Sequence, residues 1–141
     1  MIQEDKELLV KDICSRLPYG IKASYYGTEE ECETWDEIEC VTLDGYVDIG
    51  QYSLPIERIK PYLFPLSSMT KEQKIECFRG TPLQIDEDGD MAVKDVFYAY
   101  GQYTYLKSYL NVIDWINAHH FDVRGLIEKG LAIDATGLNI Y

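Results

Sequence analysis

The spacing of hydrophobic positions at the start of the chain predicts an amphipathic helix. The segment EDKELLVKDICSRLPYG (residues 4–20) places its apolar side chains on one side at the period of an α-helix. Acidic residues near its start suit the helix dipole, and a proline and a glycine end it. The apolar side chains on that side are Leu8, Leu9, Ile13 and Leu17.

A different pattern follows, and it predicts short strands. The segment IKASYY (residues 21–26) is β-branched and aromatic, and DEIECVTLDGYVDIGQY (residues 36–52) reads as two strands around Asp44-Gly45, a strong hairpin signal. The next stretch carries three prolines, each lacking a backbone donor, which indicates a short strand or helical turn between bends. One helix followed by several short strands predicts a small curved sheet or partial barrel.

The second half of the chain shows mostly helical patterns. Thr70 and Gln73 fit a capping box that begins a helix ending near Gly80. An acidic turn over residues 86–90 suggests another hairpin. The longest helix is expected over residues 104–119, and Asp122 is placed to cap a short helix that ends at Gly130.

Together these patterns predict a fold of the α+β class. Residues 1–66 are expected to form an N-terminal helix with a small curved antiparallel sheet or partial barrel. Residues 67–141 are expected to form a mainly helical subdomain packed on it, so that the chain makes one compact unit.

The only two histidines are adjacent, at the end of the longest predicted helix. Helical phase places His120 on the apolar stripe and His119 on its flank. Neighbouring residues on a helix point apart, so the pair is poorly placed to hold one metal ion. We expect a buried His120 and a surface His119; the alternative is a general base oriented by Asp122 or Asp114. The stripe consists of Leu106, Tyr109, Leu110, Ile113 and Ile116.

Charge narrows the classes of partner. The 141 residues carry a formal net charge of −12, which repels nucleic acids and anionic membranes and suits a basic protein partner. The four cysteines lack zinc-site spacing, and no calcium-loop pattern fits, so no metal or cofactor is expected. Neither a signal peptide nor a membrane span is evident, and a cytoplasmic protein is expected.

Two biased segments suggest an interface. One is acidic and the other is rich in tyrosine, a residue that gives large contact area at low entropic cost. An acidic rim around an aromatic centre favours a non-catalytic interaction protein that binds a basic partner. The candidate interface residues are Glu30, Glu31, Glu33, Tyr98, Tyr100, Tyr103 and Tyr105.

Two other classes of function stay open. A small-ligand or nucleotide-binding protein would stack its ligand on tyrosine and use Arg124 and His119 as site residues. An enzyme would use His119 or His120, although no catalytic motif accompanies them.

Three stretches resemble a family of small proteins. LLVKDICSRLPYG (residues 8–20), IKPYLFPLSSMTKEQ (residues 59–73) and DWINAHHFDVRGLIEKGLAID (residues 114–134) are similar to segments that recur in small proteins from phages, prophages and mobile elements of gut bacteria. Together the three stretches cover about a third of the chain. It implies a phage or mobile-element context, such as a host-factor inhibitor or a ligand sponge, and it carries no assigned function.

Overall fold

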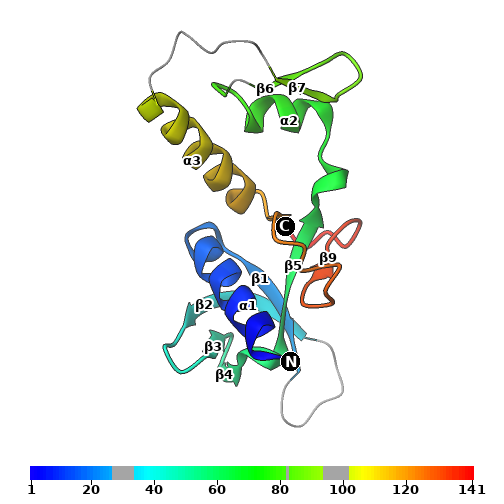
Figure 1. The fold of residues 1–141 in the computed structure, drawn as a ribbon. Coiled ribbons are helices and arrows are strands. Elements are labelled where there is room, and N and C mark those ends of the chain that lie inside the picture. The colour runs from blue at the N-terminus through cyan, green and yellow to red at the C-terminus, as the bar shows by residue number, and fades with distance from the viewer. Residues whose placement is uncertain (27–33, 82, 94–101) are drawn as a thin grey trace.

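The computed structural model describes residues 1–26, 34–81, 83–93 and 102–141. One helix lies across a sheet, and a long strand runs from that sheet toward a second helix, a small hairpin and the start of a third helix (Figure 1). The helices are α1 (Gln3–Arg16), α2 (Lys71–Cys77) and α3 (Gln102–Ala118), with 3-10 turns η1 (Leu17–Tyr19), η2 (Ile56–Arg58) and η3 (Leu66–Ser68). The strands are β1 (Lys22–Tyr25), β2 (Thr34–Val41), β3 (Tyr46–Ile49), β4 (Tyr52–Pro55), β5 (Ile59–Pro65), β6 (Leu83–Ile85), β7 (Met91–Val93), β8 (Phe121–Asp122) and β9 (Ile133–Asp134).

The main sheet is mixed, in the order β4-β3-β2-β1-β5-β8, with β9 also paired to β5. The first five strands pair antiparallel, and the predicted hairpin between β2 and β3 is confirmed, with Gly45 at φ 80°. The strands β8 and β9 instead pair parallel to β5, through Phe64 with Phe121 and Tyr62 with Ile133. The expectation of a purely antiparallel sheet is therefore wrong.

The main core lies between α1 and the sheet. Leu9 and Ile13 of the predicted helical stripe are fully buried there. Inward positions of β1 to β5 complete this core, and burial of that apolar surface is the main stabilising contribution. A second, smaller cluster joins α2, α3 and β8 through Met69, Cys77 and Val112 with their apolar neighbours.

The mainly helical C-terminal half is a wrong prediction. Residues 67–141 contain α2 and α3, but their described part also contains four short strands and several turns. The capping box at Thr70 is confirmed: its hydroxyl accepts from the Gln73 amide at 3.2 Å, and the Gln73 side chain accepts from the Thr70 amide at 2.9 Å. The boundary at residue 66 remains a prediction, although the main sheet takes strands from both sides of it.

The short helix expected before Gly130 is a series of turns. Asp122 holds these turns, because its carboxylate accepts from the amides of Arg124 (3.3 Å), Leu126 (3.0 Å) and Ile127 (2.9 Å). Capping by Asp122 is thus seen, but the amides it satisfies belong to turns rather than to a helix.

Replacing Asp122 by alanine should lower the free energy of unfolding by about 2–3 kcal/mol, since a nearly buried group would leave three amides unpaired. Urea melts measure this loss. Asp134→Ala is the matched control, because Asp134 is exposed and its carboxylate caps the single amide of Thr136; it should cost about 1 kcal/mol or less. Equal losses would show that the Asp122 bonds contribute little.

Helix α3 is rotated relative to the predicted stripe. Ile116 is buried as expected, but Tyr109, Leu110 and Ile113 are exposed, and Val112 is buried in their place. Among the described side chains of the helix, Val112, Ile116 and Asn117 are the buried ones. None of the helices in the described ranges is long and apolar enough to cross a membrane.

Candidate functional site

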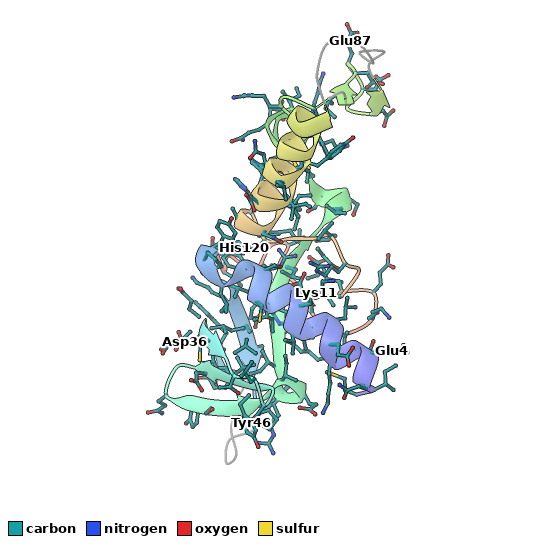
Figure 2. The ribbon with its side chains drawn as sticks, turned by 60° about the vertical axis from the view of Figure 1, so that its left-hand side comes forward. Glu4, Lys11, Asp36, Tyr46, Glu87 and His120 are labelled. Atoms are coloured by element: carbon teal, nitrogen blue, oxygen red, sulfur yellow. The ribbon has the colours of Figure 1, made fainter. Side chains whose placement is uncertain are left out.

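The histidine pair lies at the sharp turn that follows α3. The helix ends at Ala118, one residue before His119, and His120 takes a left-handed conformation with φ 61°. The His120 amide donates to the Asn117 carbonyl (3.2 Å), and its carbonyl accepts from the Phe64 amide of β5 (2.9 Å). Backbone pairing with β5 therefore fixes the turn and holds the His120 ring where α3 meets α1 (Figure 2).

Six aromatic rings form a continuous series at this turn, which we call the aromatic arc. Its two ends are parallel stacks, His119 on Trp115 at 3.8 Å between centroids and His120 on Tyr141 at 3.7 Å. Between them the centroid distances are 5.9 Å from Trp115 to Phe121, 6.0 Å from Phe121 to Phe64, and 6.0 Å from Phe64 to Tyr141. The three separations near 6 Å lie in the range of favourable aromatic pairs, and the two end pairs are closer, nearly parallel stacks.

A hollow of about 560 Å³ lies against the arc, and we call it the arc hollow. Every arc residue except Trp115 lines it. No acidic side chain is among the described residues that line it, although the chain as a whole carries a net charge of −12. The other lining residues are Ser68, Thr70, Gln73, Ala118, Thr136 and Gly137.

The His120 imidazole is buried and uncharged at neutral pH. The residue is 7% exposed, and its Nδ1 has no hydrogen-bond partner. Burial first, and then the nearby charges of Arg16, His119 and Lys22, together lower the pKa of His120 to about 4. A neutral imidazole with an unpaired nitrogen beside a hollow can hydrogen-bond to a molecule that reaches it.

Tyr141 is held firmly at the other side of His120. Although 40% of the residue is exposed, its hydroxyl donates to the Tyr62 carbonyl (2.9 Å) and accepts from the Lys22 amide (3.1 Å). Burial raises the pKa of the Tyr141 phenol to about 12. The Lys22 ammonium donates to the Ile140 carbonyl (2.9 Å) and lies 5.7 Å from the Tyr141 ring centroid.

A buried ionic cluster supports the arc from behind. Asp12 accepts from Arg16 through Nε (2.8 Å) and Nη2 (3.1 Å), and both side chains are fully buried. Arg16 Nη2 also donates to the Phe121 carbonyl (2.8 Å). Arg124 Nε lies 3.3 Å from Asp12 Oδ1, at an angle that makes no hydrogen bond. The cluster ties α1 to the turn after α3.

Unpaired buried polar atoms concentrate in this part of the molecule. In the described ranges, the buried side-chain nitrogens without a partner are Arg16 Nη1, Trp115 Nε1, His120 Nδ1 and Arg124 Nε. Two belong to the arc and two to the cluster behind it. Such atoms are uncommon in native proteins and call for an explanation, such as a bound ligand or water.

A second and larger hollow, of about 710 Å³, is the weaker candidate. It lies between α1, the turn that joins β2 to β3, and the segment from the end of β4 into η2, and the ion-paired Lys6 and Glu57 both line it. Its charged residues have both signs, and none of the unpaired buried nitrogens belongs to a residue that lines it. Volume alone therefore does not make it the better site.

The predicted site residues have different positions. His119 lines the arc hollow, and its Nδ1 donates to the Trp115 carbonyl at 2.8 Å, which leaves Nε2 for other partners. Arg124 is 27% exposed and pairs with Asp12 instead of lining the hollow. Glu30, Glu31, Glu33, Tyr98 and Tyr100 lie outside the described residues, as do the side chains of Tyr103 and Tyr105.

The remaining arc residues are absent from the sequence prediction. One signal existed for Trp115, since tryptophan and histidine four positions apart on a helix lie on one face. Phe64 lies in β5, Phe121 lies in β8, and Tyr141 follows β9. These residues are far apart in the sequence, and no local pattern links them.

Neither Asp122 nor Asp114, the two acids considered as orienting partners, is hydrogen-bonded to a histidine. Asp122 is committed to three backbone amides, and Asp114 is exposed. Across residues 102–141 no carboxylate is hydrogen-bonded to either imidazole, so neither has the orienting partner of a general base. No group of three or more metal-binding side chains occurs in the part of the chain that the structure describes.

Comparison of the chain with protein-family models, with curated proteins and with solved structures gave no match.

Proposed function

We propose that this protein is a non-catalytic small-molecule-binding protein whose ligand occupies the arc hollow. The observation that carries the proposal is a hollow lined by five aromatic rings, among them the neutral, buried imidazole of His120, whose Nδ1 has no hydrogen-bond partner. A ligand that supplies the missing hydrogen bond would remove the cost of that unpaired nitrogen, about 1–3 kcal/mol for a buried polar group.

Size and composition support the proposal. Pockets for small molecules usually enclose about 300–1,000 Å³, with mainly aromatic and apolar walls and a few polar groups. The arc hollow fits this description, because aromatic rings line one side while the side chains of Ser68, Thr70 and Gln73 supply polar atoms. Binding does not need a general base, and neither imidazole is hydrogen-bonded to an orienting carboxylate among the described residues.

Binding of a basic protein partner is a separate prediction that depends on other residues. Its acidic segment and most of its tyrosine segment lie outside the described residues. The same holds for the phage or mobile-element context, which rests on resemblance alone. A ligand sponge from such an element would be consistent with the binding function proposed here.

A fragment screen tests the proposal. We expect small polar aromatic fragments, detected by ligand-observed NMR, to bind the wild type at one site. Ala118→Leu adds bulk to a residue that lines the hollow and should abolish binding. Asn111→Leu adds the same side chain at an exposed position of the same helix and should leave binding intact. Fragments that bind both variants equally, or bind none of the three proteins, would refute the proposal.

A further inference from the structure

We infer that the arc hollow selects a flat aromatic ring that is uncharged or anionic, and that it rejects a cationic ring of the same shape. This inference rests on the proposed function and specifies the chemistry of its ligand. It goes further because aromatic walls by themselves leave the charge of the ligand open: they stack on flat rings, and they also attract cations.

The shape of the ligand follows from the ring series. The exposed His119 ring and the Phe64 and Phe121 rings all line the hollow. His119 also stacks on Trp115 with an angle of 16° between ring planes, and this leaves its second face for another ring. A flat ligand can therefore extend the series by one member without displacing any ring of the arc.

The charge of the ligand follows from the ionisable groups around the hollow. No acidic side chain is among the described residues that line it, and the one carboxylate of the cluster behind it, Asp12, already serves Arg16 and Arg124. The Tyr141 ring, which would be a cation site, has the Lys22 ammonium 5.7 Å from its centroid. A second cation would meet Arg16 and Lys22 with no free partner.

His120 supports this conclusion independently of any ligand. Its pKa is lowered to about 4 by burial first, and then by the charges of Arg16, His119 and Lys22. The imidazolium of His120 is thus disfavoured at this position, and a ligand cation placed beside it would meet the same neighbouring charges of Arg16 and Lys22.

Three probes with one ring and three charges test the inference. Indole-3-acetate is anionic, indole-3-acetamide is neutral and tryptamine is cationic at pH 7. Titrations would be followed by the imidazole NMR signals of His119 and His120 in the full chain. We expect the acid and the amide to shift these signals with a Kd at least about tenfold lower than that of tryptamine, since a factor of ten corresponds to one pKa unit. The net charge of −12 attracts tryptamine to the protein in general, so its rejection here would be specific.

Matched variants separate the two levels of the proposal. Loss of binding in Ala118→Leu but not in Asn111→Leu places the probes in the hollow; if Ala118→Leu does not fold, Ser68→Leu blocks the hollow from an exposed position. Equal or tighter binding of tryptamine at this site overturns the inference on charge and leaves the binding function intact. Silence of all three probes, with fragments of other classes bound, overturns the aromatic class alone. Binding that the blocking variants do not change overturns both proposals.

Discussion

Replacing Asp12 by asparagine should lower the free energy of unfolding by about 3–5 kcal/mol, the typical cost of breaking a buried ion pair by removing one partner. The carboxylate is fully buried and is the counter-charge of the fully buried Arg16. Asparagine has nearly the same size, so the loss would reflect charge and hydrogen bonding rather than a cavity. The buried guanidinium would remain without compensation, and the link from α1 to the Phe121 carbonyl would weaken.

Asp5→Asn is the matched control on the same helix. Asp5 pairs with Lys129 at 3.6 Å, and the two side chains are 24% and 51% exposed. Exposed pairs contribute little, so this variant should stay within about 1 kcal/mol of the wild type in urea melts. A double change of Asp12 and Arg16 to leucine should recover part of the loss, because two apolar side chains leave no isolated charge. Equal effects of Asp12→Asn and Asp5→Asn would show that the buried pair contributes no more than a surface pair.

The second large effect concerns pH, and it comes from His120. The unfolded chain takes up the imidazole proton near pH 6.5, whereas the folded protein takes it up only near pH 4. Between these values the unfolded state binds more protons, so the free energy of unfolding falls as the pH falls. Above pH 6.5 this contribution is complete. A shift of this size corresponds to about 2–3 kcal/mol after allowance for the small exposed part of the ring.

His120→Asn isolates this effect. Asparagine does not titrate, and it tolerates the left-handed conformation of this position. Carboxyl groups whose pKa is lowered in the folded state, such as those of Asp48 and Glu57, titrate in both proteins and so cancel in the difference. We expect the wild type to lose about 2–3 kcal/mol more than His120→Asn between pH 7 and pH 4. Parallel stability curves for the two proteins would contradict the lowered pKa of His120.

The features that sequence predicts correctly are those encoded within a few neighbouring residues. The Asp44-Gly45 turn and the capping box of Thr70 and Gln73 are local chemistry, and both occur as expected. The burial of His120 is also confirmed, but not through the helical phase on which the prediction was based. His120 lies after the end of the helix, and its left-handed backbone conformation turns the ring inward. That turn depends on backbone pairing with β5.

What sequence could not predict depends on pairings between distant segments. The strands β8 and β9 have two residues each, which is too short for an alternating pattern. They are strands only because their backbones pair with β5. The same limit applies to the candidate site. Asp12 and Arg16 have the spacing of an ordinary surface pair on a helix. They form a buried cluster because Phe121 and Arg124, which are distant in the sequence, contact them in the fold.

The parallel edge of β5 has a consequence for how the chain is made. During synthesis β5 leaves the ribosome before α2, β6, β7 and α3, and its partners β8 and β9 come only after all of them. Throughout that interval the nascent sheet has an open edge on a strand of largely buried residues, a template for pairing with another nascent chain. Pro61 and Pro65 lie in this strand, and neither has a backbone N–H to donate. The two prolines therefore reduce the capacity of the waiting strand to template aggregation until its own partners have been synthesised.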